Sequence, residues 1–156
     1  MGEITIRQAT KSDIEAVHGL LRELSEYLDA EIDLQLDGMK RLFDLMVREP
    51  ARYRNLIAVV EGEIAGFISV VYNLTLFHRK GTALINELVV SAKHRNVGVG
   101  KALIQEVLRI SKEEGWDEVQ VGAKKTNSSA IGFYRKMGFD REYILLVKEF
   151  DSECEA

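Results

Sequence analysis

The sequence predicts an α/β (α+β) domain with a mixed sheet and helices on both of its faces. Strand-like and helix-like segments follow one another in the order β-α-α-β-β-β-α-β-α-β. The segment Ala83–Val90 is apolar except for Asn86 and Glu87, which is typical of a strand covered on both faces. The chain has 156 residues and no recognisable repeat or linker. A single domain over residues 1–156 is therefore expected.

The first half of the chain is expected to contain one strand, two helices and a hairpin. A helix capped by Thr10 or Ser12 follows the first strand, and its apolar stripe runs from Ile14 to Leu28. Pro50 ends the second helix, and Glu61-Gly62-Glu63 marks a tight turn. The other expected elements are a strand at Glu3–Ala9, an acidic connection at Asp29–Asp33, a helix at Leu34–Val47 and strands at Asn55–Val60 and Ile64–Leu74.

The second half is expected to alternate strands with helices. Gly115 and Gly138 stand where a glycine would close a helix in a left-handed conformation. The expected elements are the strand at Ala83–Val90, a helix at Gly98–Glu113, a short strand at Glu118–Gly122, a helix at Asn127–Met137 and a last strand at Tyr143–Phe150.

Composition and charge narrow the class of protein. The net charge is −4, which argues against nucleic acid as a partner because such binding needs a basic surface. The longest apolar runs are too short to span a membrane. The single Cys154 leaves no internal disulfide to form, so a reduced, cytoplasmic protein is expected. No spacing among His18, His78 and His94 suggests a metal site.

One turn carries a possible anion site. Arg95-x-x-Gly98-x-Gly100 lies between the apolar strand and the following helix. The first amides of a helix have no partner within it, and the helix dipole makes them favour a phosphate group. Glycines in this position allow a ligand to approach the backbone closely. The turn matches neither the dinucleotide-binding nor the Walker phosphate loop.

This turn, the strand ending Glu87-Leu88-Val89-Val90, and the pattern Asn127-x-x-Ala130-x-x-Phe133-Tyr134-x-x-Met137-Gly138-Phe139 occur together. In this order and spacing the chain resembles the GNAT superfamily of acyl-coenzyme-A-dependent N-acyltransferases, and it looks closest to the branch that acetylates diamines and other small amines. The resemblance implies a GNAT fold: a mostly antiparallel seven-stranded sheet, splayed between its fourth and fifth strands, with about four helices.

The resemblance also implies where acetyl-CoA would bind as co-substrate. In the family the pyrophosphate sits on the turn, the pantetheine arm pairs with the central strand, and a strand N–H, at Val89 or Val90 here, faces the thioester oxygen. Asn127 would bond the pantetheine arm or simply cap its helix. The implied cofactor residues are Leu88, Val89, Val90, Arg95, Asn96, Val97, Gly98, Val99, Gly100, Lys101, Asn127, Ala130 and Tyr134.

The reaction needs an acid and a base. Tyr134 matches the family's tyrosine acid, which would protonate the departing thiolate; its alternative role is core packing. Glu87 lies in an apolar strand, where burial would raise its pKa and suit proton abstraction; the alternative is a structural ion pair. Relatives acting on polyamines resemble one another in having glutamate where this chain has Asn86. Substrate contacts are expected from Tyr27, Asn86 and Glu87, and no metal is expected.

The expected function is therefore transfer of an acetyl group from acetyl-CoA to a primary amine of a small molecule, such as a polyamine, amino acid or aminoglycoside. Direct transfer is expected because no Cys or Ser appears beside a base in the motifs. The alternatives are a protein or peptide N-acetyltransferase and a non-catalytic acyl-CoA sensor. Many relatives are homodimers, so the resemblance also implies a homodimer.

Overall fold

The computed structural model describes residues 2–27 and 35–151. Five strands form one sheet in the order β1-β2-β3-β4-β5, in which β5 is parallel to β4 and the other neighbours are antiparallel. The strands are β1 (Ile4–Gln8), β2 (Tyr53–Val60), β3 (Glu63–Leu74), β4 (Gly81–Val90) and β5 (Glu118–Val121). The helices are α1 (Ile14–Tyr27), α2 (Leu36–Val47), α3 (Val99–Glu113) and α4 (Ser128–Lys136), with 3-10 turns η1 (Lys11–Asp13) and η2 (Ala92–His94).

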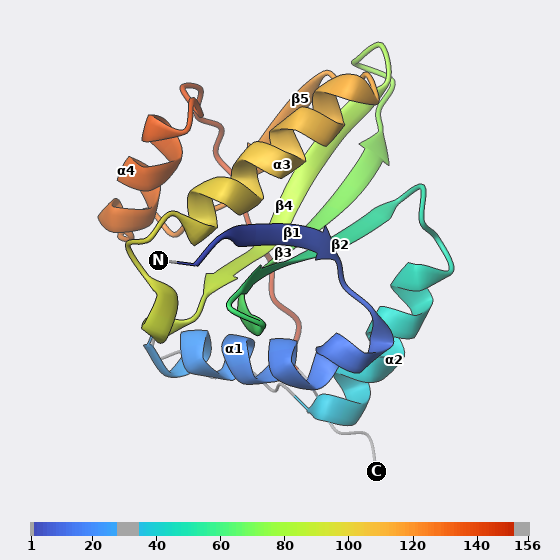
Figure 1. The fold of residues 1–156 in the computed structure, drawn as a ribbon. Helices are drawn as coiled ribbons and strands as arrows, with labels where there is room; N and C mark the ends of the chain where they lie inside the picture. The colour runs from blue at the N-terminus through green and yellow to red at the C-terminus, as the bar shows by residue number, and fades with distance from the viewer. Residues whose placement is uncertain (1, 28–34, 152–156) are drawn as a thin grey trace.

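The sheet separates two apolar clusters, so the expectation of helices on both faces is confirmed (Figure 1). On one face α3 buries Val99, Leu103, Ile104 and Val107 against the central strands. On the other face α1 and α2 pack on Ile57, Phe67 and Val89. Successive residues of a strand point to opposite faces, which is why β2, β3 and β4 supply side chains to both clusters.

The expected seven strands are not found: the described residues contain five. The strand expected at Tyr143–Phe150 is also wrong, because this segment has no strand hydrogen bonding. Its apolar side chains are exposed, from 68% for Tyr143 to 90% for Ile144. A β-type sequence forms a strand only where a neighbouring strand pairs with it, and none does so here.

Of the two capping residues expected for the first helix, the structure uses Thr10, which is the N-cap of η1, the 3-10 turn that leads into α1. Thr10 is the capping residue: Asp13 Oδ2 accepts hydrogen bonds from the Thr10 N–H at 2.7 Å and from its hydroxyl at 3.0 Å. The same carboxylate, which is almost fully buried, accepts two hydrogen bonds from Arg7 on β1, at 2.8 and 2.9 Å. This pair ties the first strand to the first helix. The predicted Leu28, Asp29–Asp33 and Leu34 lie outside the described residues.

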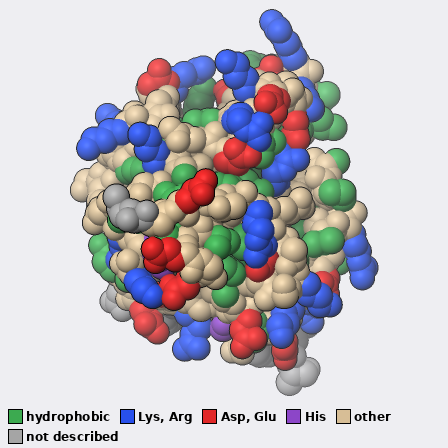
Figure 2. Space-filling view, viewed as in Figure 1, with side chains coloured by type: hydrophobic (Ala, Val, Ile, Leu, Met, Phe, Trp, Pro, Cys, Tyr) green, Lys and Arg blue, Asp and Glu red, His purple; other side chains and the backbone are tan. Residues whose placement is uncertain are grey.

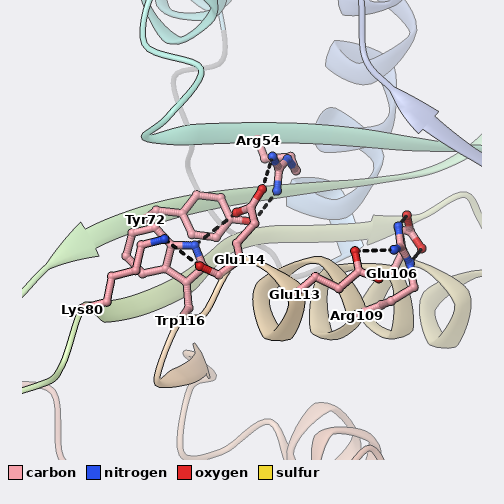
Figure 3. A network of polar contacts seen from close by, with 8 residues as sticks. All are labelled: Arg54, Tyr72, Lys80, Glu106, Arg109, Glu113, Glu114 and Trp116. Carbon is pink, nitrogen blue, oxygen red and sulfur yellow. Dashed lines mark hydrogen bonds and ion pairs between the residues drawn. The ribbon is translucent and has the colours of Figure 1, made fainter.

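A polar network fixes the C-terminal end of α3 to the sheet (Figure 3). The Arg54 guanidinium on β2 donates to Glu114 at 2.7 Å and to the Tyr72 hydroxyl at 3.1 Å. Lys80 donates to the Glu114 carbonyl at 2.7 Å and lies over the Trp116 ring. Because its far end is held in this way, α3 presents its N-terminal end at a fixed place beside β4.

On the face shown in Figure 2, acidic and basic side chains are interspersed. None of the helices in the described part of the chain combines the length and the apolar character that crossing a bilayer requires.

Candidate active site

The pairing between β4 and β5 stops halfway along β4. Thr82–Ile85 pair with Glu118–Val121, whereas β4 continues to Val90 and β5 ends at Val121. The register between β3 and β4 also shifts here, because Ser69 pairs with Glu87 and the next residue, Val70, pairs with Ile85. Asn86 is the extra residue of this bulge, and a bulge bends its strand. The expected splay between the fourth and fifth strands is thus present, with Asn86 at its origin.

The alternation of hydrogen bonds identifies which amides face the unpaired edge of β4. The Ser91 N–H donates to the Ala65 carbonyl of β3 at 2.9 Å. Alternate residues of an antiparallel strand direct their N–H groups to opposite sides, so Val89 also points toward β3. Leu88 and Val90 therefore direct their N–H and C=O groups toward the gap. Of the two donors expected from the sequence, Val90 has the required direction and Val89 does not.

The turn after η2 leaves a row of amides without backbone partners. Asn96 and Gly98 adopt positive φ angles of 62° and 91°, and Gly98 is the N-cap residue of α3. Among the described residues, no backbone carbonyl accepts from the N–H groups of residues 96–101, and the first hydrogen bond of α3 runs from Ala102 to Gly98. Val99 is buried while Val97 and Lys101 reach solvent. The arrangement has the free amides that bind a phosphate group at a helix start.

The end of α1 contacts this turn directly. The Glu23 carboxylate accepts a hydrogen bond from the Ala92 N–H at 2.6 Å and lies 4.0 Å from the Arg95 guanidinium. The Arg95 guanidinium also stacks over the Tyr27 ring, 5.0 Å from its centre. Tyr27, expected to contact the acceptor, is exposed and lies against Arg95 of the turn. No sequence motif indicates a role in the site for Glu23.

Glu87 faces the α1–α2 side of the sheet, the side on which Val89 packs. Part of its side chain reaches solvent, yet the surrounding protein raises the pKa of the carboxyl group, an effect that a hydrogen bond from Ser69 partly offsets. No cation of the described residues pairs with Glu87, so the alternative of a structural ion pair is not found. Ser69 was missed because nothing in the sequence distinguishes it from other small strand residues. Asn86 is exposed.

Tyr134 lies on the opposite side of the sheet from Glu87, in the cluster of α3 and α4. Its ring packs against Phe133 and Phe139, with centres 5.6 and 5.9 Å apart. Burial raises the pKa of the phenol, so the hydroxyl remains protonated at neutral pH. No described residue forms a hydrogen bond with this hydroxyl, which leaves it available to a ligand.

Asn127 caps α4: its Oδ1 accepts the Ala130 N–H at 3.1 Å. Asn127 therefore has the capping role expected as one of its two alternatives, and its side-chain amide nitrogen can still donate to a ligand. The Ala130 amide is occupied by the same bond, so Ala130 can offer a ligand only its methyl group and carbonyl.

One expectation about nucleophiles is corrected. Ser91, which follows β4, forms a 2.9 Å hydrogen bond with His94 Nδ1, so a serine does stand beside a base. The His94 Nε2 atom is 3.9 Å from Glu63. Ser91 is nevertheless buried and lies four residues beyond Glu87, about 13 Å along an extended strand. That distance separates the Ser91 hydroxyl from Glu87, the base expected from the sequence, although Ser91 directly follows Val90.

Other candidate features lie elsewhere. A cleft of about 390 Å³ lies between β1, β2 and the C-terminal half of α3, and includes Arg54 and Glu114 of the network described above. Within residues 2–27 and 35–151, no group of three or more His, Cys, Asp or Glu side chains is arranged to hold a metal ion.

Comparison with known proteins agrees with this geometry. The profile described as the acetyltransferase (GNAT) family matches residues 17–139. Streptothricin acetyltransferase of Streptomyces lavendulae is 27% identical over 154 residues, covering 85% of this chain and 79% of that protein. An uncharacterised N-acetyltransferase of Methanocaldococcus jannaschii is 26% identical over 90% of this chain, which spans 62% of that relative.

Solved structures show the same fold. A transcriptional regulator from Bacillus halodurans superposes with a TM-score of 0.83 at 23% identity, covering 95% of this chain and all of that one. With the profile match, the parted β4 edge and the free amides of the turn, these findings identify the chain as a member of the GNAT family, an acetyl-CoA-dependent N-acetyltransferase.

Proposed function

We propose that this enzyme transfers the acetyl group of acetyl-CoA directly to a primary amine of a small molecule, such as a polyamine, an amino acid or an aminoglycoside. The observation that carries the proposal is the parted edge of β4 beside the free amides at the start of α3. The pyrophosphate would bind to the amides of residues 96–101, and the pantetheine arm would pair with Leu88 and Val90 as an added strand does.

The residues at the gap supply the groups that the chemistry needs. An ammonium group with a pKa near ~10 must lose a proton before its nitrogen can attack the thioester carbon. The carboxylate of Glu87, whose pKa is raised, would take that proton directly or through water. The Val90 N–H would stabilise the oxyanion that forms. As the carbon–sulfur bond breaks, the Tyr134 hydroxyl would give its proton to the thiolate.

Glu87 and Tyr134 lie on opposite faces of the sheet, and on this proposal each would reach the gap from its own face. In the proposed complex the amine therefore approaches from the α1–α2 face, while the departing thiol lies on the α3–α4 face. On this proposal each proton transfer has its own group, since Glu87 would take the proton of the attacking ammonium and Tyr134 would give one to the departing thiolate, which suits direct transfer in a ternary complex. Ser91, the residue that directly follows β4 and precedes η2, is on this proposal a structural residue.

Two observations support a small cationic acceptor. The relative from Streptomyces lavendulae is named for acetylation of streptothricin, a small molecule. The carboxylates of Glu87 on β4 and of Glu26 near the end of α1 would attract a cation. The remaining acidic residues expected in this region, Asp29, Glu31 and Asp33, lie outside the described residues. A cytoplasmic location, expected from the sequence, and a homodimer, implied by the family resemblance, are also part of the proposal.

The deciding experiment measures thiol release from acetyl-CoA with a panel of polyamines, amino acids, aminoglycosides and lysine-containing or free-N-terminal peptides. Turnover with a small amine and none with the peptides is the expected result. Preference for peptides would replace the proposal with protein or peptide acetylation. Coenzyme A binding without turnover on any amine would favour the acyl-CoA sensor. A burst of thiol release without amine, abolished by Ser91→Ala, would show an acyl-enzyme and refute direct transfer.

A further inference from the structure

The 3-10 turn η2 connects the end of β4 to the row of free amides at residues 96–101, so its position determines where those amides lie. Elements far away in the sequence hold η2 from two sides. On one side the Glu23 carboxylate of α1 accepts the Ala92 N–H (Figure 1). On the other side the contacts come from β3, the neighbour of β4 in the sheet.

The beginning of β3 extends past the end of β4 and lies alongside η2. The Ser91 N–H donates to the Ala65 carbonyl at 2.9 Å, so the antiparallel register of the two strands continues beyond β4. Two residues further along, this register brings Lys93 opposite Glu63. The Lys93 Nζ atom donates to both carboxylate oxygens of Glu63, at 2.8 and 3.1 Å. Lys93 of η2 is therefore held to the first residue of β3.

The Glu63 carboxylate also faces the His94 ring. The His94 Nε2 atom is 3.9 Å from Glu63, and Nδ1 of the same ring is hydrogen bonded to the Ser91 hydroxyl at 2.9 Å. The imidazole, whose side chain is only 13% exposed, thus lies between a carboxylate of β3 and a hydroxyl at the end of β4. The tautomer with its proton on Nε2 satisfies both contacts, because Ser91 can then donate to Nδ1.

A tight hairpin supports Glu63 in this position. A two-residue turn, Glu61-Gly62, joins β2 to β3, and Val60 pairs with Glu63 across it. Both turn residues have positive φ angles, 51° and 79°, as in the hairpin turns whose twist matches that of the strands. The hydrogen bond from Lys93 lowers the pKa of the Glu63 carboxyl group, so the group is ionised at neutral pH. A fixed negative charge therefore stands beside η2.

We propose that Glu63, acting through Lys93 and His94, is a positioning residue that sets the place of the 96–101 amides before coenzyme A binds. The inference rests on the proposed function, because it takes those amides to be the pyrophosphate site. Groups that are already in place bind a ligand more tightly than groups that binding must first order. Loss of Glu63 should therefore weaken coenzyme A binding.

The effect of charge alone has the opposite sign. Glu63 and coenzyme A are both negative, so removal of the Glu63 charge without any change in the turn would strengthen binding. A positioning role and a merely electrostatic one are thus separated by the direction in which the dissociation constant moves.

The test is isothermal titration of the full chain with coenzyme A. Glu63→Gln keeps the size of the side chain, and we expect it to raise the Kd about 3- to 10-fold. Glu61→Gln is the matched control, because it removes the same charge from an exposed residue of the same hairpin. It should bind as tightly as wild type or more tightly.

Two variants at His94 test the second contact. His94→Ala should weaken binding at least as much as Glu63→Gln does, since it removes the contacts with both Glu63 and Ser91. His94→Asn should weaken it less, because its side-chain oxygen can accept from Ser91 in place of Nδ1. Equal losses in these two variants would remove Ser91 from the positioning group.

Steady-state kinetics give a second readout. The KM for acetyl-CoA should rise in Glu63→Gln with kcat unchanged, as expected when binding is lost equally from the ground state and the transition state. A residue that only stabilised the fold would instead lower kcat and the titration stoichiometry by reducing the amount of folded protein, and would leave the Kd of the remainder unchanged. That pattern would overturn the proposal.

Equal or tighter binding by Glu63→Gln would also overturn the proposal, and so would equal losses in Glu63→Gln and Glu61→Gln. Gly100→Ala, which adds a methyl group inside the phosphate site, distinguishes this failure from that of the proposed function. Weaker binding in Gly100→Ala but not in Glu63→Gln would refute the positioning role alone. Unchanged affinity in Gly100→Ala would refute the phosphate site itself.

Discussion

Gly100 allows the proposed phosphate site to be tested without disturbing the fold. It is the second residue of α3, has no positive φ angle, and a Cβ atom added there would lie 3.5 Å from Phe133 and 3.5 Å from Val90, which is ordinary contact. Alanine is favoured over glycine in a helix by about 0.5–1 kcal/mol. Gly100→Ala should therefore leave the stability unchanged or raise it by up to that amount.

The same methyl group should weaken coenzyme A binding. It would stand between Val90, whose amide faces the gap, and Phe133 of α4, in the space the pantetheine and pyrophosphate would share. A hydrogen bond to a charged group contributes about 1.5–3 kcal/mol. Displacing the pyrophosphate from one amide of the turn is thus expected to weaken binding by about 10- to 100-fold.

Isothermal titration with coenzyme A and thermal unfolding, carried out on the same preparations, separate the two effects. Gly19→Ala in α1 is the matched control, because an added Cβ atom there meets nothing within 4 Å. It should gain stability in the same way and bind coenzyme A as wild type does. Unchanged affinity in Gly100→Ala would refute the proposed cofactor position. Gly98 is a poorer test, since its φ of 91° makes any side chain strain the backbone.

Variants at four further positions each test one side chain. Glu87→Gln should lower turnover and remove the acidic limb of the pH–rate profile; because the folded pKa is raised, ionisation of Glu87 costs stability as pH rises, so this variant should also melt higher at neutral pH. Tyr134→Phe keeps the ring packing and should lower kcat about 10²- to 10⁴-fold with unchanged coenzyme A affinity by titration. Glu23→Ala should weaken coenzyme A binding about 3- to 10-fold, and Glu23→Gln, which still accepts the Ala92 N–H, should do so less; equal affinity in all three proteins would show that the contact does not support the site. Asp13→Asn should cost about 1–2 kcal/mol in urea unfolding at pH 7: the pKa of Asp13 is lowered from 3.8 to about 2, so its contribution is present above pH 4 and is lost as pH falls toward 2, where variant and wild type should converge.

For the helices and strands that pack one face against the core, the sequence predicted most of the first and last residues to within two positions. The apolar stripe that begins at Ile14 and the apolar run that ends at Val90 predicted these elements correctly, because their apolar side chains are buried in the structure. The strand predicted at 143–150 is not found. Its residue types favour a strand, but a strand forms only where a partner strand pairs with it. A sequence pattern cannot supply that partner.

Of the candidate site, the positions were predicted better than the directions. The family resemblance implied that Leu88, Val90, Gly98 and Tyr134 border one gap, but only hydrogen bonding in three dimensions shows that Val90 rather than Val89 faces the unpaired edge of β4. The contact of Glu23 with Ala92 joins residues 69 positions apart, which no local pattern reveals. The pair Ser91 and His94 is different, since its spacing of three residues was visible in the sequence.

The position of the turn depends on a glycine outside it. A Cβ atom at Gly66 on β3 would come within 2.8 Å of Val99 and 3.0 Å of Leu103, so only glycine lets the start of α3 lie this close to the sheet. Gly66 pairs with Val90, the residue whose N–H faces the gap. Gly66 thus lets the start of α3 lie close to β3 and β4. The separation of β4 from β5 begins at the Asn86 bulge, and both features act on the Val90 end of β4. The free amides of the helix and of the strand border the same space because of these two local features.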